Sequence, residues 1–173
     1  MKNQRILITV SVLFFLGLVC GGCGTLSKKM TLEPGVTGVP NKQVEVGSVE
    51  NASKVTIEFD FASFFKKELE TALKKYQVPL TAGDNKDRLI LRSRVVEYEP
   101  GNAFKRWLLP GYGNTVCAVS VEISDAASSK QLGTLKVRRV VMAGGLYTVG
   151  AHQTVFREVA RAVAKQLKEE MAV

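Results

Sequence analysis

The sequence predicts an α+β fold, a two-layer sandwich in which two helices cover one face of a mainly antiparallel four-stranded sheet. Four segments alternate apolar and polar residues, a pattern typical of half-buried strands. Two further segments repeat apolar residues at helical spacing. The segments follow the order β-α-β-β-β-α, and the three consecutive strands favour antiparallel pairing.

The first predicted strand, 53–61, places Val55, Ile57 and Phe59 on one side. A helix is expected to follow it over 61–77, with Asp60 as its N-cap. The remaining elements are strands over 87–99, 115–125 and 134–142 and a closing helix over 153–171.

The chain begins with a short basic segment, MKNQR, followed by an apolar run over 6–19. Crossing a bilayer takes about 20 residues of helix, so this shorter run is typical of a secretory signal peptide. The sequence Gly21-Gly22-Cys23 comes next and resembles a bacterial lipobox, in which the cysteine is acylated. We therefore predict lipidation of Cys23.

Three regions follow from this reading: a lipoprotein signal peptide over 1–22, a flexible tether over 23–43 and a single periplasmic α+β domain over 44–173. The tether is rich in Gly, Pro, Ser and Lys and has no sustained apolar period. Gly24 stands where an aspartate would signal retention in the inner membrane. We expect a lipid anchor in the outer membrane, with the domain facing the periplasm.

The sequence predicts no enzyme, no cofactor and no metal site. His152 is the only histidine, so any catalytic triad or His-Cys metal site would have to use it. Cys117 shares its phase with the apolar positions of a predicted strand. We interpret it as a small buried hydrophobe rather than a nucleophile.

The formal net charge of +8 favours anionic partners. The predicted strands bring four cations to the open face of the sheet around Glu122, and cross-strand pairing is expected to neutralise one or two of them. The rest suit an anionic lipid, a glycolipid or an acidic patch on a partner. Nucleic acid is not expected, because the aromatic residues are not interleaved with the cations. The four cations are Arg92, Arg94, Lys136 and Arg138.

The segment 99–114, EPGNAFKRWLLPGYGN, is longer than a usual hairpin connection. Its aromatic and basic residues suit a docking surface for a partner protein or a membrane interface. The alternative is that the loop folds back and Trp107 covers the domain's own core. The residues of this predicted docking loop are Phe104, Lys105, Arg106, Trp107 and Tyr112.

The region 95–168 also resembles a family of bacterial lipoproteins known as domain of unknown function 4410 (DUF4410). The resemblance is carried by EYEPGNAFKRWLLPGYG, by VCAVSVEISDAASSKQLGTL, by the glycine pair at 144–145 and by the closing helix. Within the first stretch, the family features are Pro100-Gly101, Arg106-Trp107 and the spaced glycines Gly111 and Gly113. The resemblance implies an exported, lipid-anchored domain with no established activity.

Together these observations predict a non-catalytic outer-membrane lipoprotein whose domain binds an envelope protein. The alternative is a lipid- or glycolipid-binding accessory of envelope assembly or transport that uses the basic face of the sheet.

Overall fold

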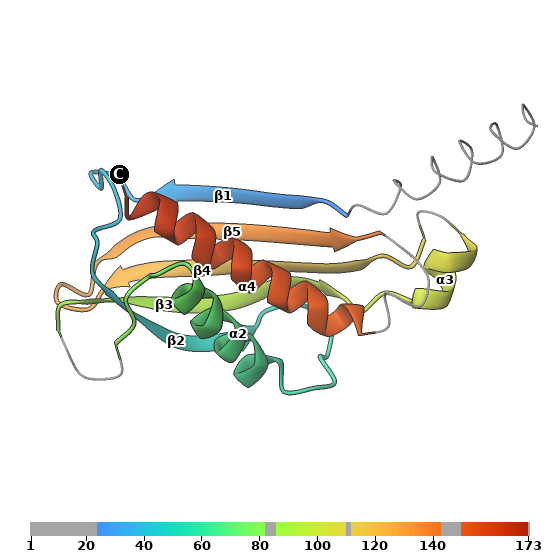
Figure 1. Cartoon of the computed structure of the whole chain (residues 1–173). Coiled ribbons are helices and arrows are strands. Elements are labelled where there is room, and N and C mark those ends of the chain that lie inside the picture. The colour runs from blue at the N-terminus through green and yellow to red at the C-terminus, as the bar shows by residue number, and fades with distance from the viewer. Residues whose placement is uncertain (1–23, 82–85, 110–111, 143–149, 173) are drawn as a thin grey trace, which may run out of the picture.

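The computed structural model contains a five-stranded sheet with two long helices on one face (Figure 1). It describes residues 24–81, 86–109, 112–142 and 150–172. The strands are β1 (Leu26–Leu32), β2 (Gln43–Asn51), β3 (Arg88–Glu99), β4 (Thr115–Asp125) and β5 (Gln131–Val141). The helices are α2 (Phe61–Lys75), α3 (Ala103–Leu108) and α4 (Ala151–Glu170).

The strands lie in the order β1-β5-β4-β3-β2. Neighbouring strands are antiparallel except β2 and β3, which are parallel. Parallel neighbours need a crossover, and α2 supplies it between β2 and β3. The α+β class and the two helices on one face are confirmed. The prediction of a four-stranded, mainly antiparallel sheet is corrected to five strands in a mixed sheet.

Two strands differ from the prediction. The segment expected to be a flexible tether contributes β1, whose Met30 and Leu32 pack against the core. The first strand of the predicted domain lies over Gln43–Asn51 rather than over 53–61. Residues Ile57 and Phe59 still contact the core, but from the connection between β2 and α2.

The core lies between the sheet and the two helices. The side chains of β4 that face it alternate along the strand, and all are buried: Cys117, Val119, Val121 and Ile123. Phe156 of α4 is completely buried, and its ring centre lies 5.4 Å from that of Tyr98 on β3. Burial of large apolar side chains such as these supplies most of the stability of the fold.

The N-terminus of α2 is fixed as the sequence predicts. The Asp60 carboxylate accepts a hydrogen bond from the Ser63 backbone N–H at 3.1 Å, which satisfies a donor that has no partner within the helix. The hydrogen bonds with Ser63 lower the pKa of Asp60.

A cluster of polar side chains lies at the end of the sheet where β4 turns into β5. Lys42 donates to Asp125 at 2.8 Å and forms an ion pair with Asp87 at the same distance. Asp125 also accepts hydrogen bonds from the backbone N–H and hydroxyl of Ser128. The interactions with Lys42 and Ser128 lower the pKa of Asp125 to about 2. This cluster fixes the end of the β1–β2 connection to the β4–β5 turn.

Candidate docking surface and basic sheet face

The start of β1 and the predicted docking loop lie at the same end of the sheet. Leu26 pairs with Arg139 of β5, and Val141, two residues further, pairs with Thr115 at the start of β4. The loop occupies the connection just before Thr115. Figure 1 shows α3 beyond this end of the sheet, which is also the end at which β1 and α4 begin.

Gly24 is attached directly to the sheet. Its carbonyl oxygen accepts a hydrogen bond from Arg139 Nη1 at 2.9 Å, and the carbonyl oxygen of Thr25 accepts from the Val140 N–H at 2.9 Å. Arg139 Nε also donates to Glu158 of α4 at 2.6 Å. A Cβ atom at position 24 would lie 1.8 Å from the carbonyl oxygen of Val140, so this close approach requires glycine. The predicted lipidation site, Cys23, immediately precedes Gly24 and lies outside the described residues.

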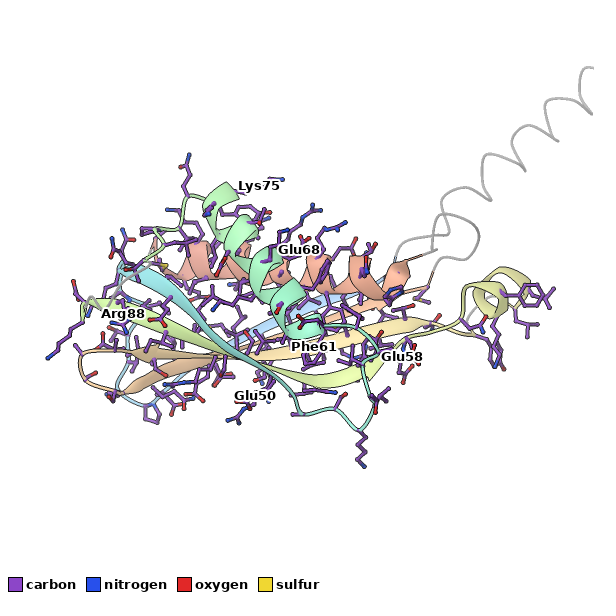
Figure 2. The ribbon with its side chains drawn as sticks, turned by 90° about the horizontal axis from the view of Figure 1, so that it is seen from below. Glu50, Glu58, Phe61, Glu68, Lys75 and Arg88 are labelled. Atoms are coloured by element: carbon purple, nitrogen blue, oxygen red, sulfur yellow. The ribbon has the colours of Figure 1, made fainter. Side chains whose placement is uncertain are left out.

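The docking loop contains a short helix, α3, which the sequence analysis did not predict. Asn102 caps the helix by accepting a hydrogen bond from the Lys105 N–H at 2.9 Å. The backbone N–H of Asn102 donates to the carbonyl oxygen of Gly113 at 2.9 Å, which closes the loop at its base. The loop therefore has a defined local structure, a short capped helix above a hydrogen-bonded base. Figure 2 shows α3 projecting beyond the end of the sheet, away from the labelled residues of α2.

The described apolar side chains of this projection face solvent. Phe104 is 65% exposed and Tyr112 is 68% exposed, and Leu108 and Leu109 are also exposed. The charged Lys105 is exposed among them. Clustered exposed apolar residues mark interaction sites. The side chains of Arg106 and Trp107 lie outside the described part of the structure.

Leu108 and Leu109 are part of this surface but were missing from the predicted docking residues. Their signal is the sequence WLLPG, in which two leucines directly precede a turn and have no alternating or helical pattern to bury them.

The open face of the sheet carries the four predicted cations, but three of them have acidic partners. Arg92 lies 3.4 Å from Glu122, and Arg94 lies 3.6 Å from Glu50. With the Arg138–Glu97 pair they make three neutralised cations, which corrects the expectation that cross-strand pairing would neutralise only one or two of the four.

The third pair, Arg138 with Glu97, is the best formed. Two guanidinium nitrogens of Arg138 donate to the two carboxylate oxygens of Glu97, each at 2.8 Å. The pair spans Ala118, which is the register partner of both residues on the strand between them. The hydrogen bonds lower the pKa of Glu97 and raise the pKa of Arg138.

Lys136 differs from the three arginines. It is exposed, and among the described residues it has no carboxylate within ion-pair distance. Its direct partner across the β1–β5 pairing is another exposed lysine, Lys29. Sequence analysis missed Lys29 because it lies in the segment expected to be a tether.

Lys29, Lys136 and Arg138 line a hollow of about 230 Å³ on the open face of the sheet. Val96 and Ala118 contribute apolar surface to it. Val96 lies on this face by the alternation of β3, on the same side as Arg92 and Arg94. A β-bulge between Val95 and Glu97 brings Glu97 to the same face. The Val96 side chain is 47% exposed.

The two residues considered for catalysis occupy different places. Cys117 is buried in the core, and burial raises the pKa of its thiol to about 12. His152 stands in the first turn of α4, with its ring centre 5.6 Å from that of Phe59. It lines a hollow of about 540 Å³ together with Glu58 and Tyr98. Burial raises the pKa of Tyr98.

Among the described residues, no helix is long and apolar enough to cross a bilayer. No group of three or more His, Cys, Asp or Glu side chains in the described ranges is arranged to hold a metal ion.

Solved structures that are similar to this chain come from several bacteria. The PelC dodecamer from Paraburkholderia phytofirmans matches with a TM-score of 0.59 and 14% identity, over 83% of this chain and 98% of that one. The hypothetical protein CT253 from Chlamydia trachomatis matches with a TM-score of 0.52 and 8% identity, over 76% and 98%. A minor lipoprotein from Acinetobacter baumannii matches with a TM-score of 0.38 and 17% identity, over 76% and 93%.

No curated protein has a matching sequence. The family model for a domain of unknown function, DUF4410, matches residues 33–145, which include β2 to β5, α2 and the whole docking loop. The resemblance found in the sequence is thereby confirmed, and the chain belongs to the DUF4410 family.

Proposed function

We propose that this chain is a non-catalytic lipoprotein, acylated at Cys23 and held in the outer membrane, whose periplasmic domain binds an envelope protein through the docking loop. The observation that carries the proposal is the exposed apolar surface of the loop, formed by Phe104, Leu108, Leu109 and Tyr112. Such a surface is costly to leave in water and is typical of an interaction site.

The position of the loop restricts its partner. The loop lies at the end of the sheet where Gly24 is hydrogen-bonded to Arg139, one residue after the proposed anchor. With Cys23 acylated, the docking loop lies beside the membrane surface. Its partner is therefore an envelope protein that is embedded in or attached to the same membrane.

A second copy of this chain meets that description. The structurally similar PelC is a dodecamer. Copies that share one membrane would hold their docking loops at one height above it, where the loops could contact a neighbouring copy.

The non-catalytic part of the proposal rests on what the candidate groups do. The Cys117 thiol lies in the core with a pKa raised to about 12, which leaves almost no thiolate at neutral pH. The imidazole of His152 packs against the ring of Phe59. These positions support structural roles for the two residues.

Site-specific photocrosslinking in intact cells tests the docking loop. A benzoylphenylalanine at position 104 should give an adduct with an envelope protein, identified by mass spectrometry and by the reciprocal crosslink from that protein. The matched control is position 127, which is exposed in the β4–β5 turn at the opposite end of the sheet. An adduct between two copies would identify self-assembly. Adducts with lipid alone from position 104 would overturn partner binding by the loop.

Labelling with palmitate tests the anchor separately. The full chain should incorporate the label, and the Cys23→Ala variant should not. Label retained in Cys23→Ala would show that acylation occurs elsewhere.

A second candidate function is a lipid- or glycolipid-binding accessory of envelope assembly or transport. The specific observation that favours it is the pair of exposed lysines, Lys29 and Lys136, that face each other on the open side of the sheet. The basic face originally predicted there is reduced by the ion pairs of Arg92, Arg94 and Arg138.

A further inference from the structure

We propose that the hollow between β1, β5, β4 and β3 binds a phosphate-bearing group of headgroup size, held between Lys29 and Lys136. This inference deepens the second candidate function and rests on it, since it names the site and the chemical class of its ligand. The ligand's phosphate can belong to a lipid headgroup or to a soluble phosphate ester, and the experiment below separates the two sources.

The arrangement of charge points to an anion. Lys29 and Lys136 are direct partners in the antiparallel β1–β5 pairing, where opposed Cβ atoms lie about 4.5–5.5 Å apart. Like charges at such positions destabilise a sheet. Among the described residues neither lysine has a carboxylate partner, whereas the three arginines of this face each have one. An anion between the two ammonium groups would remove the repulsion.

Nearby Glu97 does not fill this role. Both of its carboxylate oxygens accept hydrogen bonds from Arg138, and this pair lowers the pKa of Glu97, so the carboxylate is ionised and already engaged. Arg138 borders the same hollow, but its charge is paired with Glu97, which leaves the two lysines as the cations available to a ligand. Phosphate oxygens are well suited to several such donors at once.

The size and lining of the hollow restrict the ligand further. Its volume of about 230 Å³ lies below the range of roughly 300–1,000 Å³ that is usual for sites of drug-sized molecules. Val96 and Ala118 give it an apolar wall beside the cations. A small group that joins a phosphate to carbon, such as glycerol phosphate, matches both features.

The hollow also lies within reach of a membrane surface. Lys29 is three residues beyond Leu26 along β1, about 10 Å at the usual rise of a strand. Leu26 is itself three residues beyond Cys23. A lipid headgroup at the surface that holds the anchor is therefore a close source of the ligand.

Native mass spectrometry of the full-length chain in a neutral detergent tests the proposal. The probes are dihexanoyl phosphatidylglycerol, dihexanoyl phosphatidylcholine and free glycerol 3-phosphate. We expect one phosphatidylglycerol to bind per chain, and the double variant Lys29→Gln, Lys136→Gln to weaken this binding about tenfold or more, because both opposed cations are removed. Phosphatidylcholine, which has no net charge, should bind more weakly.

The matched control is the double variant Arg92→Gln, Arg94→Gln. It removes the same amount of charge from the same face, but from residues outside the hollow, and should leave phosphatidylglycerol binding unchanged. Thermal unfolding of each variant checks that it is folded. Binding of glycerol 3-phosphate with the same dependence on the lysines would identify a soluble source and still support the site. If neither phosphatidylglycerol nor glycerol 3-phosphate binds, the proposal is wrong. It is also wrong if the two double variants weaken phosphatidylglycerol binding equally.

The same spectra report the anchor independently, because the intact mass shows whether Cys23 carries acyl chains. Failure of the site and failure of the lipid anchor are therefore distinct outcomes.

Discussion

Arg139 joins Gly24 to α4: Nη1 of the guanidinium donates to the Gly24 carbonyl oxygen at 2.9 Å, and Nε donates to the Glu158 carboxylate at 2.6 Å. The side chain is mostly buried between β1 and the helix layer. It holds the start of an edge strand, to which pairing with β5 and the Lys28–Glu169 ion pair also contribute.

Replacement of Arg139 should therefore loosen β1 more than it loosens the rest of the fold. For Arg139→Leu we expect a loss of about 1–3 kcal/mol in the free energy of unfolding, because charge-assisted hydrogen bonds at a partly buried site are lost. Cleavage at Lys28 and Lys29 by a lysine-specific protease should become faster. Arg94→Leu is the control, since its ion pair is exposed and longer. Equal protease sensitivity of the two variants would contradict the role given to Arg139.

Ionised Asp125 stabilises the folded protein, so the free energy of unfolding should fall when acid protonates this carboxylate. Its folded-state pKa of about 2 lies below the value of about 3.9 for an unfolded aspartate, so its contribution is complete above about pH 4 and is lost as the pH falls towards 2. Asp125→Asn should lower the midpoint of urea unfolding at pH 7 and reduce its decline between pH 4 and pH 2. Asp87→Asn should have a smaller effect, because Asp87 is mostly exposed. An unchanged acid decline in Asp125→Asn would assign it to other carboxylates.

Ser93 carries a buried hydroxyl that has no hydrogen-bond partner among the described residues. A buried polar group without a partner costs free energy, so Ser93→Ala should leave stability unchanged or raise it by up to about 1 kcal/mol. Ser124 provides the comparison, because its hydroxyl is hydrogen-bonded with Glu122 and Arg92. Chemical unfolding of Ser93→Ala and Ser124→Ala should thus give shifts of opposite sign or of clearly different size. A large destabilisation by Ser93→Ala would reveal an interaction of the hydroxyl.

The thiol of Cys117 should be protected in the native protein. Iodoacetamide reacts with thiolates, and at pH 8 a thiol with a pKa of about 12 supplies very few of them. We expect labelling of Cys117 only after the addition of denaturant, as followed by mass spectrometry of the peptide that contains it. Labelling of the native chain at the rate of a free cysteine would show that β4 opens readily.

The elements with a regular pattern could be predicted from the sequence. The strands β3, β4 and β5 and the helices α2 and α4 were expected close to where they lie, because long runs of alternating or helically spaced apolar residues leave few other ways to bury them. Cys117 was identified as a core residue for the same reason.

The strands β1 and β2 were not predicted, because their sequences alternate apolar and polar residues only in part. In β1, Lys28 occupies a position on the core-facing side of the strand and pairs with Glu169 of α4 instead of packing into the core, which interrupts the alternation. In β2, a register shift between Val46 and Val49 likewise interrupts the alternation of apolar and polar residues. The parallel pairing of β2 with β3 follows from the strand–helix–strand order. The sequence analysis predicts a mainly antiparallel sheet because it relies on the three consecutive strands that follow the first helix.

The candidate sites were predicted only in part, because a sequence shows which cations share a face but not which carboxylates reach them. Arg138 and Glu97 lie on strands that are not neighbours, and only the small side chain of Ala118 between them allows their contact. Lys29 became visible as part of the basic face only once β1 was placed beside β5.

The direct junction between Gly24 and β5 has a consequence for reach if Cys23 is acylated as proposed. The acyl chains would then be separated from the sheet by a single residue, and the longest strand, β3, spans about 40 Å. The domain could not extend further than this from the bilayer. A molecule that starts on the opposite side of the periplasm would have to cover the remaining distance itself.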